Sequence, residues 1–288
     1  RHKNISKCID FDLEKEIEAF IPETYYEIEA CIPHLKADYI IPNKKRLTKE
    51  EADQIVLDSK NPFIVKSIEN KESKRQAKVP FITSTLQQDA ISNLSMSSSR
   101  TMMVAQSLYE GKEIHGELVG LITYMRTDSN RLAEPFIKET IQYIENRFGK
   151  SYVGKYRVTT KDSAQDAHEA IRPTSLDRTP ESLEPYLSRD ELKLYKRIYE
   201  RTVASLMAPA IFDTTKVILD SHGHLYEVNG SVIKFPGHLS MYTEAKNKDK
   251  ILPELHLNQE LHAKEVNAIE KVTTPKARFS EATLIKEM

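Results

Sequence analysis

The fold is decided by a run of alternating residues late in the chain, FDTTKVILDSHGHLYEVNGSVIKF from Phe212 to Phe235. Apolar side chains occupy alternate positions early in this run, a period typical of a strand with one buried face. We expect a turn at His222-Gly223, a strand from Leu225 to Val228, and a hairpin turn at Asn229-Gly230 before a last strand. These residues therefore predict hairpins of one β-sheet.

The same period of two appears near the start of the chain. Residues Tyr25 to Ile32 alternate, and the apolar run Pro62 to Ile68 has the same character. Between them Thr48 to Leu57 is expected to form a short helix, because Thr48 and Glu51 are spaced as a capping box. Strands before residue 80 and after residue 211 are predicted to pair into one sheet.

Residues 80–208 carry a helical period instead. Thr85 and Gln88 are spaced as a capping box and predict one helix start, and the serines at 97–99 start a second helix that ends at Gly111. Two helices joined this closely can form a helix-turn-helix, although most such pairs are only packing units.

Two further helices are expected before the sheet resumes. Ser129 is placed as the cap of one, and Ser188 with Glu191 forms the capping box of a long helix that ends before Pro209. The chain is therefore predicted to have an α+β fold. In it an all-helical domain, helix-turn-helix or CAP-like, is inserted into a β-rich arch domain.

Length and composition limit the classes of function. A chain of 288 residues is long enough for two domains, and 42 basic against 43 acidic residues give no global attraction for a polyanion. Two cysteines outside any CxxC pair favour a reducing cytoplasm. No apolar run reaches the roughly 20 residues of a membrane span. The chain starts without methionine and stops after a helix-like run, so both ends read as cut.

The first candidate site is the segment Gly120-Leu-Ile-Thr-Tyr-Met-Arg-Thr-Asp-Ser129. It combines Tyr124 with Arg126 and several hydroxyls just before an expected helix start. Helix N-termini attract phosphate through their free N–H groups and dipole, so the segment is a candidate for phosphate chemistry. The plainer interpretation is a buried tyrosine at a strand end, followed by an Asp-Ser cap.

The second candidate is Asp162-Ser-Ala-Gln-Asp-Ala-His-Glu-Ala-Ile-Arg-Pro173. His168 and Arg172, one helical turn apart, would present two cationic donors to a phosphate. A lone histidine is more often a surface or structural residue, and local spacing leaves both interpretations open.

A basic run at the boundary of the helical region is interpreted as a solvated loop rather than a phosphate contact; it consists of Lys71, Lys74, Arg75 and Lys78. Gly-rich phosphate loops and the HExxH, GxSxG and CxxC motifs are absent from the sequence. ATP-dependent, zinc-protease and serine-hydrolase functions therefore lose their main support.

One longer pattern resembles a known family. Gln106-Ser-Leu-Tyr-Glu110, then eleven residues, then Ile122-Thr-Tyr-Met-Arg-Thr-Asp-Ser129 resembles the active-site signature of type IA DNA topoisomerases. Three further segments resemble bacterial topoisomerase I in the family's order: PFITSTLQQ from Pro80, DAHEAIRPT from Asp166 and ARFSEA from Ala277. The resemblance spans nearly the whole chain.

The resemblance implies transient cleavage of one DNA strand. Tyr124 would attack a phosphodiester and keep the 5′ phosphate, so that strand passage and religation relax negative supercoils without ATP. A phenol of pKa about 10 is a poor nucleophile at neutral pH. Arg126 matches the family arginine that assists at the scissile phosphate, and His168 the histidine near it. Four further residues would contact the DNA: Thr123, Arg172, Arg278 and Ser280.

The resemblance also implies a division into domains. Residues 21–79 and 209–275 would form the arch, or gate, and residues 80–208 the helical domain that carries Tyr124. Residues 1–20 would be a remnant of an adjoining DNA-binding domain, which starts again at 276–288.

Single-stranded DNA at the cleavage site is the implied partner of a monomeric, cytoplasmic, nucleoid-associated enzyme. The intact enzyme would use Mg²⁺, held by an acidic domain outside these residues, so no metal site is expected within them. The family's zinc ribbons are missing too. The chain alone is therefore expected not to relax DNA.

Two other functions stay open. The helical domain would serve as a non-covalent binding module if Tyr124 only packs or stacks on single-stranded DNA. Alternatively, the chain would act as a structural gate. Because reverse gyrase shares the signature, the chain could also be the topoisomerase part of that enzyme.

Overall fold

The structure is a computed structural model that describes residues 11–158, 168–242 and 249–287. Residues 11–18 are helical. The remaining elements are β1 (Thr24–Ile32), β2 (Leu35–Tyr39), η1 (Pro42–Lys44), α2 (Lys49–Asp58), β3 (Phe63–Arg75), α3 (Thr83–Leu94), α4 (Ser98–Glu110), β4 (Lys112–Ile114), β5 (Glu117–Val119), α5 (Glu134–Phe148), η2 (Lys150–Tyr152), α6 (Pro180–Leu183), α7 (Arg189–Ser205), β6 (Ala210–Ser221), β7 (His224–Phe235), η3 (Gly237–Met241), β8 (Glu260–Leu261), β9 (Glu265–Val272) and α8 (Glu281–Glu287).

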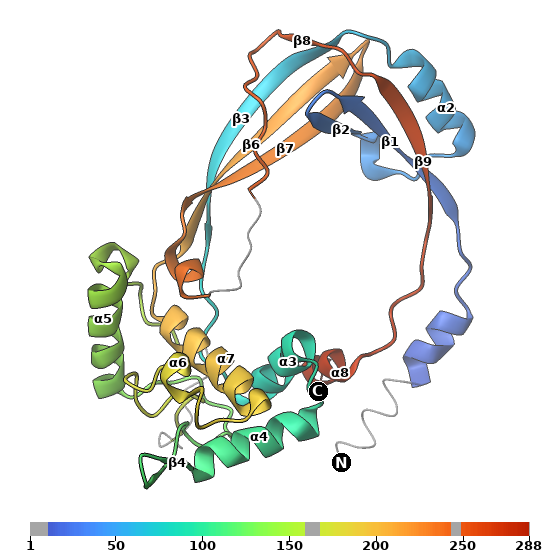
Figure 1. The fold of residues 1–288 in the computed structure, drawn as a ribbon. Coiled ribbons are helices and arrows are strands. Elements are labelled where there is room, and N and C mark those ends of the chain that lie inside the picture. The colour runs from blue at the N-terminus through green and yellow to red at the C-terminus, as the bar shows by residue number, and fades with distance from the viewer. Residues whose placement is uncertain (1–10, 159–167, 243–248, 288) are drawn as a thin grey trace.

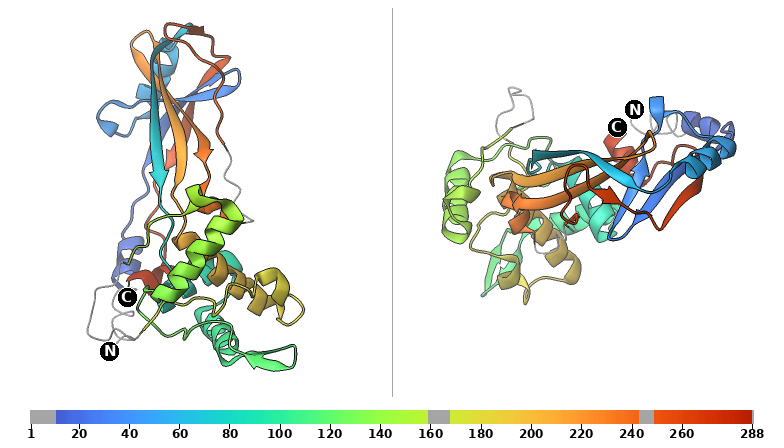
Figure 2. Two further views of the ribbon diagram at one scale, coloured as in Figure 1. Left: turned by 90° about the vertical axis from the view of Figure 1, so that its left-hand side faces the viewer. Right: turned by 90° about the horizontal axis from the view of Figure 1, so that it is seen from above.

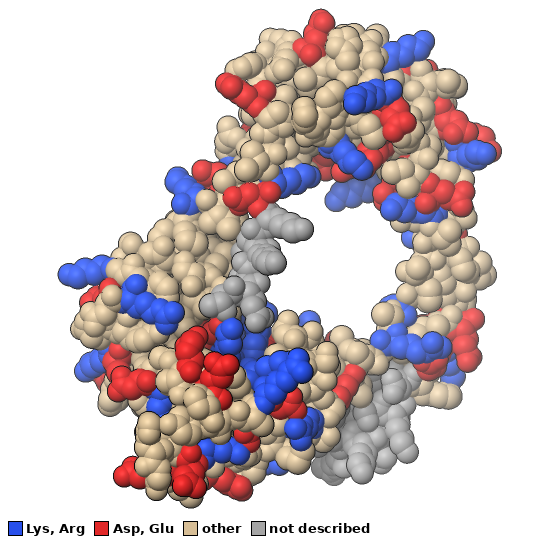
Figure 3. Space-filling model, in the orientation of Figure 1, with Lys and Arg blue, Asp and Glu red and all other residues tan. Residues whose placement is uncertain are grey.

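These elements form a ring (Figure 1). A curled antiparallel sheet of order β8-β3-β6-β7-β2-β1-β9 arches over an opening, and α3 to α7 lie at its foot. Seen from the side, the sheet stands upright on the helical part (Figure 2, left). The space-filling view shows that the opening passes through the molecule (Figure 3). The predicted α+β class is confirmed.

The sheet joins strands from both ends of the sequence, as the alternation predicted. β3 pairs with β6 from Ile64 to Arg75, and β1 pairs with β9 from Thr24 to Cys31. Lys71, Lys74 and Arg75 therefore lie in a strand, so the prediction of a solvated loop there is wrong. The strand extends past its apolar start because β6 supplies hydrogen-bonding partners along the polar stretch.

The predicted hairpin turn at Asn229-Gly230 is also wrong, because β7 runs through both residues as one strand. Asn229 pairs with Lys216 and Gly230 with Thr215, so the ladder with β6 continues. A glycine is needed at position 230 because another segment comes close to the backbone there. A Cβ at Gly230 would lie 2.6 Å from Leu252 Cγ, in a segment that crosses the sheet.

Most predicted helix caps are confirmed. Thr48 and Glu51 form the capping box of α2, Ser97 caps α4, and Ser188 with Glu191 forms the box of α7. Two others are wrong. The first predicted helix starts at Thr83 rather than after Thr85, and Ser129 caps no helix, because α5 begins five residues later at Glu134.

Two separate hydrophobic cores support the two parts of the ring. The core of the helical part surrounds Tyr195, Tyr199 and Phe81, and that of the sheet surrounds Phe63 and Tyr226. All five side chains are at most 1 % exposed, and such aromatic burial dominates core energetics. Each part therefore has its own stabilising core. Among the described residues, no helix combines the length and apolarity needed to cross a membrane.

Contacts made by α8 and by the residues just before it close the ring. α8 lies beside α3, and the Glu281 carboxylate accepts a hydrogen bond of 3.0 Å from the backbone N–H of Ser98. Ion pairs join Lys276 to Glu16 at 2.6 Å and Arg278 to Glu14 at 2.7 Å. These pairs are exposed, so the stabilisation that each gives is small and depends on salt.

The sheet and the helical part are joined by two crossing segments, one after β3 and one before β6. Gly237 lies against the second crossing, with φ of +51°. A Cβ at this position would lie 2.5 Å from the carbonyl oxygens of both Ala208 and Pro209. Only glycine fits this contact without moving backbone.

We expect Gly237→Ala to lower the free energy of unfolding by about 2–3 kcal/mol, since it adds a left-handed penalty to a backbone clash. Chemical denaturation of the 288-residue chain measures the change. Gly223→Ala is the matched control, because Gly223 also has a positive φ, +91°, but nothing lies within 4 Å of its added Cβ. Equal losses for the two variants would contradict the proposed contact at the crossing.

Candidate functional site

The segment around Tyr124 lies between β5 and α5 outside any regular element, with bends at Met125 and Asp128, and its burial alternates. Met125 and Thr127 are buried, whereas Tyr124, Arg126 and Asp128 are exposed. The Tyr124 side chain is 47 % exposed, so the interpretation as a buried tyrosine is wrong.

Tyr124 keeps its hydroxyl available. Its ring packs edge-to-face on Tyr109 of α4, with centroids 5.3 Å apart. Within the described residues, its hydroxyl forms no hydrogen bond and the Arg126 guanidinium forms no ion pair. An exposed phenol and an exposed cation two residues apart make a candidate site for an anionic substrate.

Backbone contacts from two other segments fix this stretch. Leu121 accepts a hydrogen bond from Thr174, and Thr123 donates to the carbonyl oxygen of Arg172 at 2.9 Å. On the other flank, the Thr83 N–H donates to the Thr127 carbonyl oxygen at 2.9 Å. The orphan donors at the start of α3 are thus used to hold the tyrosine segment.

The hydroxyl of Thr83 adds to this grip. It lies 2.8 Å from the carbonyl oxygen of Met125 and 3.0 Å from that of Thr127, and accepts from the Thr127 N–H at 2.9 Å. This role explains why the predicted capping box failed: the start of α3 is fixed by residues more than forty positions away.

We expect Thr83→Val to lower the free energy of unfolding by about 1–2 kcal/mol, because it leaves the partly buried Thr127 N–H without that acceptor. Thr83→Ser keeps the hydroxyl and is expected to stay close to the unchanged chain. Thermal and urea unfolding of both variants measure the difference. An unchanged Thr83→Val would show that the hydroxyl does not hold the segment.

His168 is exposed and precedes a stretch that runs beside the tyrosine segment. The Thr123 hydroxyl donates to the Ala170 carbonyl oxygen at 2.6 Å, which links the two segments. Residues 168–174 are extended, so the helical arrangement of His168 with Arg172 is wrong. Residues 162–167 of the predicted motif lie outside the described residues.

Arg172 is engaged within the protein. Its guanidinium makes two hydrogen bonds to Glu169, of 2.6 and 3.3 Å, and lies 4.1 Å from the centre of the Phe136 ring. The Arg172 side chain is only 13 % exposed. The Glu169 carboxylate also accepts a hydrogen bond of 3.4 Å from the Ala133 N–H at the start of α5. Arg172 therefore positions neighbouring segments in this conformation.

Arg278 and Ser280 lie away from Tyr124. Arg278 pairs with Glu14, and Ser280 accepts the Thr283 N–H at the start of α8. The adjacent Glu281 bonds to Ser98 beyond the C-terminal end of α3, whereas Thr83 at the other end holds the tyrosine segment. The structure thus brings together Tyr124, Arg126, Thr123 and the 168–172 stretch, but not the two residues near α8.

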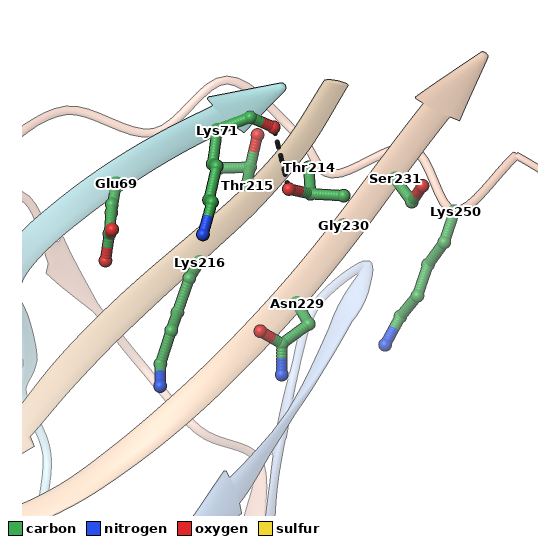
Figure 4. A pocket seen from close by; sticks show the side chains of 9 residues that line it. All are labelled: Glu69, Lys71, Thr214, Thr215, Lys216, Asn229, Gly230, Ser231 and Lys250. Atoms are coloured by element: carbon green, nitrogen blue, oxygen red, sulfur yellow. Dashed lines mark hydrogen bonds between the residues drawn. The ribbon is translucent and has the colours of Figure 1, made fainter. Parts of the chain in front are cut away.

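A basic surface lies on the sheet, apart from the Tyr124 segment (Figure 4). Lys71, Lys216 and Lys250 border a cavity of about 410 Å³ on β3, β6 and a neighbouring segment. The ammonium of Lys216 is 3.1 Å from Glu227. Lys71 and Lys250 make no ion pair within the described residues, so this surface can contact an anion.

Sequence reasoning missed three positioning residues: Tyr109, Thr83 and Glu169. All three lie in segments that resemble the family, but only the fold shows what their side chains touch. Metal binding has no corresponding cluster, since no group of three His, Cys, Asp or Glu side chains in the described ranges could hold an ion.

The comparisons with known proteins agree with this fold. A family model described as DNA topoisomerase matches residues 11–288. The chain therefore belongs to the DNA topoisomerase family, and the resemblance to type IA enzymes in its sequence is confirmed. It is similar to full-length topoisomerase I from Thermotoga maritima, with 33 % identity and a TM-score of 0.86. The match covers 98 % of this chain and 46 % of the Thermotoga chain.

Proposed function

We propose that this chain is the strand-cutting part of a type IA DNA topoisomerase, with Tyr124 as the nucleophile. The observation that carries the proposal is the exposed Tyr124 two residues before Arg126, which makes no ion pair within the described residues, on a segment fixed from both flanks. Single-stranded DNA is the proposed substrate, since an unpaired strand exposes its phosphates to a side chain on a surface.

The reaction is an exchange of phosphate esters. The Tyr124 Oη–phosphorus bond forms as the bond from phosphorus to the 3′ oxygen breaks. The phenol loses its proton and the 3′ oxygen gains one. Because the tyrosyl ester retains the energy of the broken bond, religation by the reverse step needs no ATP. Strand passage between the two steps changes the topology of the DNA.

Arg126 supports this chemistry by charge. Its guanidinium makes no ion pair among the described residues, so it can donate two hydrogen bonds to the phosphate and stabilise the negative charge that grows there. His168 is proposed to hydrogen-bond the same phosphate or to carry a proton, because its exposed ring lies on a stretch joined to the tyrosine segment. Thr123 is a positioning residue in this account.

Magnesium does not fit the described residues, which lack a carboxylate cluster. We propose that its ligands lie outside this chain, in a part corresponding to the rest of the Thermotoga enzyme, and that this chain alone does not relax DNA. Efficient magnesium-dependent relaxation by the pure 288-residue chain would overturn that second statement.

A cleavage assay tests the proposed chemistry. A chimera, with this chain in place of the matching part of Thermotoga maritima topoisomerase I, is mixed with single-stranded DNA and stopped with denaturant. If Tyr124 keeps the 5′ phosphate, a label at the 3′ end of the strand stays with the protein, whereas a 5′ label is released. Retention of the 5′ label instead would contradict the polarity of the link.

A non-covalent binding module is the second candidate, favoured by the lysine surface of the sheet. Under that function, the folded chimera binds the oligonucleotide but retains neither label after denaturation.

A further inference from the structure

A cavity of about 460 Å³ lies at the junction of the sheet and the helical part, away from the Tyr124 segment. Its walls come from the end of β3, from α7 and from η3, the short orange helix at the foot of β6 and β7 (Figure 1). The volume is in the range of small-molecule sites. The lining includes the end of β3 and the crossing segment after it as well as α7, so a ligand here would touch both parts of the ring.

Arg201 lines this cavity and is only 9 % exposed. Its Nε donates to the carbonyl oxygen of Val79 at 2.6 Å, and its guanidinium lies 4.5 Å from the centre of the Phe81 ring. No carboxylate of the described residues lies within ion-pair distance of it. Burial lowers the pKa of this guanidinium, because desolvation makes its charged form less favourable.

Two more cations line the cavity and have no carboxylate partner among the described residues. Arg75 rests on the Phe212 ring at 4.7 Å, and Lys78 is exposed. The other two charges of the lining are balanced: Arg197 is bound by Asp89 through hydrogen bonds of 2.7 and 2.6 Å, and Glu200 lies 4.0 Å from Lys196. The lining therefore carries an excess of positive charge that the described residues do not neutralise.

A buried histidine belongs to the same lining. His238 of η3 is 5 % exposed, and its enclosed Nδ1 has no hydrogen-bond partner in the described part of the chain. Because this ring is part of the lining, its signals report on a ligand that binds there. The three cations suit the oxygens of an anion.

We propose that this junction cavity binds a phosphate group, held by the buried Arg201 and by the exposed Arg75 and Lys78. The fork of the guanidinium matches phosphate oxygens, and the exposed lysine adds charge. The phosphate belongs either to a DNA backbone or to a free phosphate compound. In both cases binding joins the end of β3 to α7, so the bound form of the junction is expected to be stiffer.

The test follows the imidazole signals of His238 by NMR while inorganic phosphate is added to the 288-residue chain. We expect a saturable shift. Lys78→Ala is expected to raise the dissociation constant about tenfold, the effect of losing one charge-assisted hydrogen bond. Arg201→Lys keeps the charge without the planar fork and is expected to weaken binding similarly. Lys138→Ala on α5 removes the same charge elsewhere and should leave binding unchanged.

A second arm separates the two sources of phosphate. If an oligothymidylate without terminal phosphate shifts the same His238 signals and competes with inorganic phosphate, the ligand is a DNA backbone. If only inorganic phosphate does so, the ligand is a free phosphate compound. The proposal is overturned if neither probe moves the His238 signals, or if Lys78→Ala binds phosphate as tightly as the unchanged chain. Neither result bears on cleavage by Tyr124.

Discussion

Tyr124→Phe in the chimera with the Thermotoga enzyme is expected to lose DNA relaxation by a factor on the order of 10⁴ or more, the size found when a covalent nucleophile is removed. The change deletes one oxygen. The ring contact with Tyr109, at 5.3 Å between centroids, involves no hydroxyl and should persist. The melting temperature of the 288-residue chain should therefore stay the same.

Binding separates the catalytic function from the alternative. Single-stranded DNA should bind the Tyr124→Phe chimera with nearly unchanged affinity, as measured by fluorescence anisotropy in the absence of cleavage. Tyr109→Phe is the matched control, since it removes a hydroxyl from the partner ring and should leave relaxation within a few-fold of normal. Relaxation that survives Tyr124→Phe would leave Tyr124 with a packing function only.

Glu169→Ala is expected to lower the free energy of unfolding by about 3 kcal/mol, the low end for breaking a buried ion pair, because both partners keep some exposure. The loss has two sources. Arg172 retains its charge at 13 % exposure without a carboxylate, and the Ala133 N–H at the start of α5 loses an acceptor. Urea denaturation of the 288-residue chain measures it.

The same change should reach the candidate site. Arg172 and Ala170 hold Thr123 through backbone atoms, so loosening residues 169–172 displaces the tyrosine next to it. Cleavage in the chimera is expected to fall at least about tenfold, since small displacements of reacting groups are costly. Glu169→Gln keeps the shape of the side chain and one acceptor oxygen. Its free energy of unfolding and its cleavage activity should therefore both fall less than those of Glu169→Ala. A stable Glu169→Ala chain with full cleavage would contradict this positioning role.

Features set by neighbouring residues were predictable from the sequence. The alternation of Tyr25 to Ile32 predicted β1, and the Thr48–Glu51 and Ser188–Glu191 spacings predicted the starts of α2 and α7. In each case the hydrogen-bonding partners lie within a few positions. The candidate segment around Tyr124 was also recognisable from the sequence, because its tyrosine, arginine and hydroxyl side chains are neighbours in the chain.

The failures share a different cause, which is contact between distant parts of the chain. Asn229-Gly230 has the composition of a turn, yet β6 offers a continuous ladder and Leu252 requires the glycine for close approach. Ser129 has the composition of a cap, but the chain after it pairs with Ala170 before α5 begins. Arg172 was predicted to contact DNA, a role that stays a prediction, while its observed partner is Glu169.

The junction cavity could not be predicted either, because its residues are distant in the sequence. Arg75 and Lys78 precede Arg201 by more than a hundred positions, and only the folded chain brings them to one cavity with His238.

The central claim is that the Tyr124 oxygen carries the cut strand, and one measurement addresses it most directly. The chimera is trapped with single-stranded DNA by denaturant, digested with nuclease and protease, and its tyrosine peptides are examined by mass spectrometry. We predict a nucleotide linked through phosphate to the peptide that contains Tyr124. The Tyr124→Phe variant should give no such linked peptide. A nucleotide on any other residue, or none from a chimera that relaxes DNA, would contradict it.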